Sequence, residues 1–357
     1  MTPFTSLPEF CRSTRSRVAG FVIFVAFALL AFKSYAGREG QLTSRTLNFR
    51  GQKDQAVHRE LPGLSISRIK SMTRKPSTHG SWGDELATKY LQAMKLTLTG
   101  SLLRTPWLNP GTGNLTNLKQ NPYDDAMRIK GLDWPLFGLT MVGQKRLENI
   151  QDLLIRAIHD DLPGDFVECG VWRGGASIFA KAVIEAYASR SRHVHLADSV
   201  EGLPRSTQAR DDDSWSRMDS LKVNKDEIAG SFRDLGLLDS GVRFHKGFFR
   251  YSMPRLRAEL ETNEKQIAVL RMDGDMYEST MDILYNLYDL VPVGGCVIVD
   301  DWIIPVCQQA ITEFRKRNEV FDEIVPIDST GMFWCKTHMH PVDHHWYKVF
   351  NESRGNE

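Results

Sequence analysis

Short apolar segments alternate with helix-like segments over residues 165–336, and this alternation constrains the fold more than any other feature of the sequence. Apolar runs of strand length predict strands at residues 165–169, 193–197, 242–245, 267–272 and 296–299. Helical periodicity predicts helices between them, one ending near residue 188 and the others at residues 222–235, 251–261, 278–290 and 305–318. This pattern predicts an α/β fold, with an open, mostly parallel sheet covered by helices on both faces. Residues 323–327 and 332–336 predict a C-terminal antiparallel hairpin.

The chain of 357 residues is too long for one ordinary domain, so the predicted sheet domain, residues 161–340, must carry appendages. Residues 82–160 predict an N-terminal helical cap. Within it, four apolar residues recur at a spacing of four and predict one helix: Leu86, Tyr90, Met94 and Leu98. A second helix is predicted at residues 144–160. Residues 341–357 are expected to form a polar C-terminal tail.

The N-terminus has the pattern of a membrane-targeting segment. Arg12, Arg15 and Arg17 precede an uncharged apolar run that begins at residue 18. We expect residues 1–17 to be a cytosolic tail and residues 18–36 to be a signal anchor, because positive charges stay on the cytosolic side. The alternative is a signal peptide, since Ser34 and Ala36 have the spacing of a cleavage site.

Residues 37–81 are polar and lack periodicity, which is typical of a stem or linker. Together these features predict a single-pass membrane protein of the secretory pathway, in the Golgi or the endoplasmic reticulum, with a luminal catalytic domain. A secreted protein is the alternative, if the segment is cleaved.

Charge and cysteine content exclude several classes of protein. The chain has 45 Lys and Arg against 44 Asp and Glu, so it lacks the basic excess typical of nucleic-acid-binding proteins. None of its five cysteines falls in a C-x-x-C pair, which disfavours a zinc or dithiol site. We expect Cys169, Cys296 and Cys335, which lie in or beside predicted strands, to be buried small apolar groups.

Ligands of open α/β sheets bind beyond the carboxyl ends of the strands, so the residues that follow each strand are the candidates for a site. A glycine-rich turn, with glycines at 170, 174 and 175, follows the first strand. Trp172 stands where a dinucleotide-binding turn needs its second glycine, which disfavours a pyrophosphate-bearing cofactor and suits S-adenosylmethionine better. Asp198, after the second strand, could accept hydrogen bonds from the ribose hydroxyls of an adenosine cofactor.

Four carboxylates follow the fourth and fifth predicted strands, residues 267–272 and 296–299. Asp273 and Asp275 end one predicted strand, and Asp300 and Asp301 end its neighbour. These groups would repel one another at one sheet edge unless they were protonated or bound a cation. A hard divalent ion, Mg²⁺ first and Mn²⁺ or Ca²⁺ as alternatives, therefore fits the pattern.

A series of ordered motifs between residues 121 and 336 resembles the macrocin O-methyltransferase (TylF/MycF-like) family of class I methyltransferases, which methylate sugar hydroxyls on macrolides. The motifs are GLDWP, TMVG, GDFVECGVWRGGAS, DSVEGLP, LRMDGDMYEST and VDDW, followed by the GMFW ending. The resemblance implies a Rossmann-like methyltransferase domain.

The resemblance also implies which residues form the site. S-adenosyl-L-methionine would be bound by Thr140, Met141, Glu168, Gly170, Val171, Trp172, Ser177 and Asp198. A divalent cation would be held by Asp273, Asp300 and Asp301, and Asp273 or Asp275 would accept the proton of the hydroxyl. Met276 stands where related catechol-type enzymes often have a lysine.

The sequence therefore predicts an S-adenosylmethionine- and metal-dependent O-methyltransferase that acts on a sugar hydroxyl of a glycan or glycoside. A homo-oligomer is compatible with it, since related enzymes often assemble as oligomers. Two alternatives remain open at this point. One is a membrane-tethered glycan-binding protein that keeps the fold without catalysis, and the other is an NAD-linked sugar-modifying enzyme.

Overall fold

The computed structural model describes residues 82–108, 120–187, 191–208, 210–211, 216 and 218–354. The predicted cytosolic tail, anchor segment and stem, residues 1–81, lie outside this part of the chain. Within the described residues, none of the helices has both the length and the apolar character needed to cross a bilayer.

A seven-stranded sheet forms the centre of the fold, in the order β6-β5-β4-β7-β8-β10-β9. The first five strands of this order are parallel, and β10 runs antiparallel to both of its neighbours. The strands are β4 (Asp165–Cys169), β5 (Val194–Asp198), β6 (Val242–Lys246), β7 (Ile267–Met272), β8 (Cys296–Val299), β9 (Val325–Pro326) and β10 (Met332–Cys335). The predicted Rossmann-like sheet and C-terminal hairpin are confirmed.

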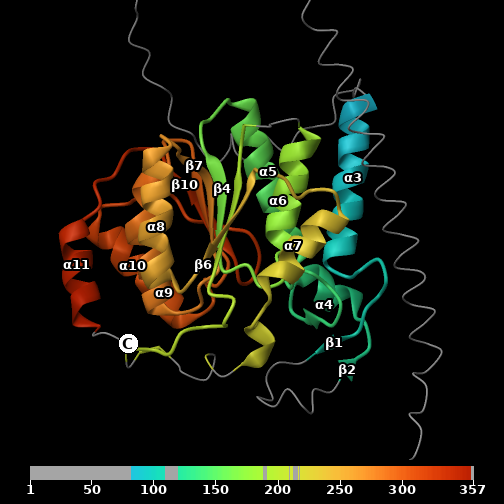
Figure 1. The fold of residues 1–357 in the computed structure, drawn as a ribbon, viewed down its shortest axis with the longest axis horizontal. Helices are drawn as coiled ribbons and strands as arrows, with labels where there is room; N and C mark the ends of the chain where they lie inside the picture. The colour runs from blue at the N-terminus through green and yellow to red at the C-terminus, as the bar shows by residue number, and fades with distance from the viewer. Residues whose placement is uncertain are drawn as a thin grey trace, which may run out of the picture. The chain divides into compact units, whose positions relative to one another are not determined.

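Helices cover both faces of the sheet (Figure 1). On one face lie α8 (Phe249–Thr262), α9 (Tyr277–Leu287) and α10 (Pro305–Arg317), and on the other lie α5 (Gln144–His159) and α6 (Gly175–Ala186). The described residues also form α7 (Lys225–Asp234) and two short 3-10 helices, η4 (Asp219–Leu221) and η5 (Tyr288–Leu290). The central strands β4, β7 and β8 are wholly buried because they are covered on both faces, whereas the edge strands β6 and β9 are partly exposed.

Alternation along the strands sends two charged residues to one particular face. Val167 and Cys169 of β4, with Leu270 and Met272 of β7, belong to the apolar core under α8, α9 and α10. The residues between them therefore point to the opposite face, toward α5 and α6. Glu168 and Arg271 are direct neighbours in the register of β4 and β7, so the sheet itself places this carboxylate beside this guanidinium group.

The predicted cap contains more than helices. Besides α3 (Trp82–Leu98) and α5, it holds α4 (Asp125–Lys130) and a small antiparallel sheet of β1 (Trp107–Leu108), β2 (Gln120–Asn121) and β3 (Trp134–Pro135). Arg128 of α4 is almost fully buried and bonds to Asp133, to Thr105 and to the carbonyl oxygen of Thr99. This one side chain links α3 to the segment that leads into the site.

Within the expected polar C-terminal tail, residues 344–353 form helix α11 (His344–Ser353). Its Tyr347 stacks on Tyr285 of α9 with ring centroids 5.1 Å apart and donates a hydrogen bond to Asp282. Arg354, which follows the helix, pairs with Asp282 at 2.6 Å. Aromatic and charged contacts thus attach a segment whose composition looked like a solvated tail.

The prediction that Cys296 and Cys335 are separate buried thiols is wrong, because the two form a disulfide between β8 and β10. They are direct partners in the antiparallel register, which brings together residues 39 positions apart in sequence. Cys169 is a free, fully buried thiol, as expected.

Candidate active site

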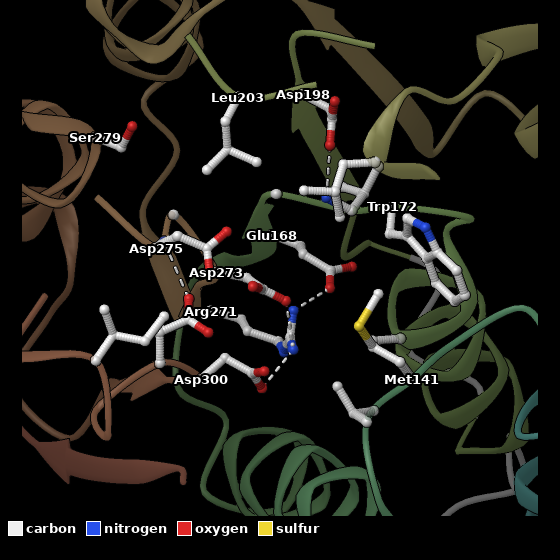
Figure 2. Close-up of a pocket in the computed structure, with 18 of the residues that line it drawn as sticks. Met141, Glu168, Trp172, Asp198, Leu203, Arg271, Asp273, Asp275, Ser279 and Asp300 are labelled. Atoms are coloured by element: carbon white, nitrogen blue, oxygen red, sulfur yellow. Dashed lines mark hydrogen bonds and ion pairs between the residues drawn. The ribbon is translucent and has the colours of Figure 1, made fainter. Parts of the chain in front are cut away.

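A cavity of about 280 Å³ opens at the carboxyl ends of the parallel strands. It lies where the strand order reverses between β4 and β7, the place where ligands bind in open α/β sheets. Figure 2 shows residues from the loops after β4, β5, β7 and β8 pointing into it. With one exception, every predicted site residue lines this cavity: Thr140, Met141, Glu168, Gly170, Val171, Trp172, Asp198, Asp273, Asp275, Asp300 and Asp301.

The exception is Ser177, predicted as a cofactor ligand. It is fully buried in the first turns of α6 and is absent from the cavity wall. Its hydroxyl donates a hydrogen bond to Oε2 of Glu168. Ser177 therefore does not face the cavity. It orients Glu168, the acid that does.

The backbones of the strand ends pack directly on one another at Gly170. This residue has φ +86°, and a Cβ added to it would lie 1.8 Å from the carbonyl oxygen of Asp273. Its N–H donates to the carbonyl oxygen of Ala197, and the N–H of Asp273 donates to that of Cys169. Only glycine allows the loops after β4 and β7 to meet this closely.

Asp198 joins the loops after β4 and β5. One carboxylate oxygen accepts the N–H of Val171 at 2.8 Å, and the other accepts the N–H of Val200 at 2.7 Å. Burial raises the pKa of Asp198, although these backbone donors oppose the shift. The backbone N–H of Trp172 also bonds to this carboxylate, which has about four lone-pair sites, so it can still accept a hydrogen bond from a ligand in the cavity.

Two tryptophans form an aromatic wall. The ring centroids of Trp134 and Trp172 are 6.4 Å apart, and both rings line the cavity. Trp172 has a positive φ of 45°, and its indole N–H donates to the carbonyl oxygen of Ser220. These constraints hold a flat apolar surface where a dinucleotide-binding protein would have glycine.

Arg173 holds the segment that covers one side of the cavity. Its Nη1 donates to the carbonyl oxygens of Pro135, Leu136 and Gly138 at 2.9–3.2 Å. The segment continues directly into Thr140, Met141 and Val142, which line the cavity, and the hydroxyl of Thr140 accepts the N–H of Val142. Three carbonyl contacts from one guanidinium therefore position this cover over the site.

The predicted acid cluster is assembled. Asp273, Asp300 and Asp301 each bring one carboxylate oxygen to within 4.8 Å of the others, an arrangement that could hold a metal ion. Asp275 has a positive φ of 55°, and its N–H donates to Oδ2 of Asp301 at 3.1 Å. Figure 2 shows Asp273, Asp275 and Asp300 converging on one side of the cavity, with Glu168 beyond them.

Two buried arginines, which sequence reasoning missed, lie among these acids. Arg271 pairs with Glu168 and Asp300 at 2.5 Å and with Asp273 at 2.9 Å. Arg146 of α5 pairs with the other oxygen of Asp300 at 2.5 Å and with Asp328 at 3.1 Å. Part of the repulsion that we expected a cation to relieve is therefore relieved by protein side chains, and both oxygens of Asp300 already accept from guanidinium groups.

The arginines do not compensate the whole cluster. Arg146 and Arg271 lower the pKa of Asp300 despite its burial. Burial together with the charge of Asp300 raises the pKa of Asp273 to about 6, and burial with the charge of Asp273 raises that of Asp275 to about 7. The pKa of Asp301 rises well above its ordinary value, from burial and the neighbouring acids. The negative charge around Asp275 and Asp301 is therefore not fully compensated by the two arginines.

Comparison with known proteins identifies the family. A sequence model of the macrocin O-methyltransferase (TylF) family matches residues 87–336. The chain belongs to this family. Members are S-adenosylmethionine-dependent O-methyltransferases, and the chain is therefore an enzyme of this class.

Individual relatives agree with this family. The demethyldecarbamoylnovobiocin O-methyltransferase of Streptomyces niveus is 39% identical over 258 residues, which cover 70% of this chain and 93% of that protein. The mycinamicin III 3''-O-methyltransferase of Micromonospora griseorubida is 42% identical and covers 60% of this chain and 84% of its own length. The solved structure of the O-methyltransferase NovP superposes with a TM-score of 0.63 at 38% identity, over 71% of this chain and all of that one.

Proposed function

We propose that this methyltransferase transfers the methyl group of S-adenosylmethionine to a sugar hydroxyl of a glycan or glycoside, with help from a divalent cation. The observation that carries the proposal is a single cavity with an adenosine-compatible loop at one end and an uncompensated acid cluster at the other. A methyl donor, a cation and an acceptor hydroxyl must meet within such a space for an in-line transfer.

The cofactor would occupy the side formed by the loops after β4 and β5. S-adenosylmethionine supplies an electrophilic methyl group on a sulfonium. Asp198 is placed to accept ribose hydroxyls, and the wall of Trp134 and Trp172 offers a flat surface for the adenine ring. Glu168, whose pKa burial raises to about 7, is held by Arg271 and Ser177 beside the point where the two halves of the cavity meet.

The acid cluster fits a hard divalent cation. Glu168 and five aspartates line the cavity, and Arg146 and Arg271 are the only basic residues among its described lining, so the excess is negative. Asp301 and Asp273 have oxygens for a cation, and Asp300 retains lone pairs beyond those that its two arginines use. A cation bound there would lower the pKa of a hydroxyl and orient it.

We assign the acceptance of the hydroxyl proton to Asp275 in preference to Asp273. Arg271 pairs with Asp273, whereas no arginine of the described residues pairs with Asp275. A carboxylate that no guanidinium holds keeps lone pairs with which it can accept a proton. Asp275 can therefore take up the proton as the oxygen attacks and release it afterwards.

The names of two relatives support a sugar as the acceptor. One is a mycinamicin III 3''-O-methyltransferase, and another, 39% identical, is a tetracenomycin methyltransferase named for the 4'-oxygen of a rhamnosyl group. Those names specify the acceptors of those proteins. For this chain we propose a sugar hydroxyl and leave the aglycone open.

We also propose that the catalytic domain lies in the lumen of the secretory pathway, tethered by residues 18–36. The apolar run behind Arg12, Arg15 and Arg17 supports the tether. The Cys296–Cys335 disulfide supports the lumen, because disulfides persist in oxidising compartments and are rare in the cytosol.

The function is tested with the full-length protein, S-adenosylmethionine labelled on the methyl group, Mg²⁺ and a panel of glycosides. We expect label on a sugar oxygen, loss of transfer in chelator and recovery when Mg²⁺ is restored. Asp301→Asn should lower kcat by about a hundredfold or more, since a catalytic cation contributes several kcal/mol.

Glu323→Gln is the matched control, because Glu323 is an exposed acid outside the cavity. Its turnover should equal that of the wild type. Undiminished transfer by Asp301→Asn in chelator would rule out the cation, and label on nitrogen or carbon instead of oxygen would rule out the proposed acceptor.

A further inference from the structure

A second, smaller hollow adjoins the main cavity. It measures about 20 Å³, and the two share Pro204, Phe248, Phe249 and Ser279 as walls. Ser279, in the first turn of α9, lies on the same side of the main cavity as Asp275 in Figure 2. A substituent of an acceptor held at the acid cluster would therefore reach the small hollow along these shared walls.

Three arginines line the small hollow, and two of them have buried donors without acceptors. The side chain of Arg354 is 2% exposed; its Nη atoms pair with Glu278 and Asp282, but its Nε has no hydrogen-bond partner. Nη1 of Arg250 is also buried and unpartnered, while its Nη2 donates to the carbonyl oxygen of Asn351 at 3.1 Å. Arg205 is the third, and its side chain is exposed. Buried N–H groups left without acceptors are costly, so this arrangement favours a ligand that accepts hydrogen bonds.

The described residues that line the hollow carry a single positive excess, from three arginines and two acids. The two acids are Glu278 and Asp282, and both pair with Arg354. Glu278 also accepts hydrogen bonds from the N–H and hydroxyl of Thr207, which leaves it little capacity to neutralise Arg250 or Arg205. The balance matches one negative charge on a ligand.

Resting on the proposed function, we infer that the small hollow is an anion subsite that selects an acceptor sugar with a carboxylate, a uronic acid. A carboxylate supplies one negative charge and two acceptor oxygens, and a guanidinium can bind it through two parallel hydrogen bonds. Arg250 is the specificity-determining residue, because it lines the hollow and its Nη1 has no hydrogen-bond acceptor among the described residues.

The test measures binding without requiring turnover. Calorimetry with the full-length protein, S-adenosylhomocysteine and Mg²⁺ compares matched pairs of acceptors: 4-nitrophenyl glucuronide with glucoside, and galacturonide with galactoside. Each pair differs only at C6. We expect the uronide of at least one pair to bind about tenfold more tightly than its neutral partner.

Variants assign the preference to Arg250. Arg250→Met should bring the two members of the preferred pair to within about twofold of each other, and Arg250→Lys should restore part of the difference. Arg255→Met is the control, because Arg255 lies on the same helix and lines neither cavity. It should keep the full preference.

Equal affinity for both members of both pairs would overturn the subsite, as would a preference that survives Arg250→Met. Tighter binding of the glucoside 6-sulfate than of the uronide would also overturn the assignment to a carboxylate. Methyl transfer is scored separately on the neutral glycosides. Transfer without uronide preference therefore refutes only the subsite, while absence of transfer to any sugar refutes the proposed function.

Discussion

Arg271 is the residue on which the geometry of the site depends most. It lies fully buried between an acid on the cofactor side, Glu168, and two acids on the cation side, Asp273 and Asp300. A buried guanidinium with a fixed fork of donors can hold three carboxylates at set positions, which a lysine could not do. The cofactor half and the acid half of the cavity are therefore linked through one side chain. No motif spacing predicted it, because the contact depends on how β4 and β7 align.

His245 illustrates a buried residue far from this chemistry that sets a limit on stability. Its Nε2 shares a hydrogen bond with Nδ1 of His195 at 2.9 Å, and Nε2 of His195 shares one with Asp165 at 3.2 Å. Nδ1 of His245 lies 3.8 Å from Oε2 of Glu259. Burial, with smaller effects from His195 and Arg243, lowers the pKa of His245 to about 4. The folded protein thus holds His245 neutral at pH values where an unfolded histidine is protonated.

The direction of the pH effect follows from this difference. As the pH falls below about 6.5, the unfolded state takes up a proton that the folded state refuses, so the free energy of unfolding decreases until about pH 4. The loss attributable to His245 should be of the order of 3 kcal/mol. Urea unfolding at pH 7.5 and pH 5 should show a smaller loss for His245→Gln than for the wild type. The exposed His345→Gln is the control, and identical losses in all three proteins would show that His245 does not cause the effect.

At the scale of elements, the sequence predicted the bounds of the strands closely, but it did not predict helix α11 or the contacts that hold α9. Residues 165–169, 267–272 and 296–299 form strands with the predicted bounds, because short apolar runs bordered by turns have few other ways to be buried. Helix α11 was missed, since its polar and aromatic residues show their role only when Tyr347 reaches Tyr285. The anchoring of α9 was missed for the same reason: Asp211, from a distant loop, accepts the N–H groups of Tyr277 and Glu278.

The pair β8 and β10 provides the element-scale test of the proposed location. The disulfide joins these two strands, and Cys169 and Cys307 remain free thiols that serve as internal controls. For protein made in eukaryotic cells and denatured without reductant, we expect alkylation of Cys169 and Cys307, and of Cys11 in the N-terminal segment, but not of Cys296 or Cys335. Cys296 and Cys335 should react after reduction.

A variant without residues 18–36 should stay in the cytosol and show all five thiols free. Site-by-site mass spectrometry of the alkylated peptides makes the comparison. Alkylation of Cys296 and Cys335 in the unreduced full-length protein would remove the support that the disulfide gives to a luminal domain.

At the scale of the whole domain, the sequence predicted which residues would meet at the site, but it did not predict how their charges are balanced. Parallel strands must end at one edge, so residues that follow β4, β5, β7 and β8 had to meet, and they line one cavity. The inward placement of Arg146 and Arg271, and the position of Ser177 behind Glu168, depend on packing between elements distant in sequence. The expectation of a cation from acid spacing alone therefore overlooked that two of the positive charges come from the protein.

The central claim is that the acids hold a divalent cation beside the methyl group of the donor. Nuclear magnetic resonance of S-adenosylmethionine carrying ¹³C in its methyl group tests this claim most directly, with Mn²⁺ as the paramagnetic probe. The account predicts strong broadening of the bound methyl resonance by stoichiometric Mn²⁺ in the wild-type protein, and its loss in Asp301→Asn with the cofactor still bound. A bound methyl resonance that stays sharp in wild-type protein saturated with Mn²⁺ would contradict it.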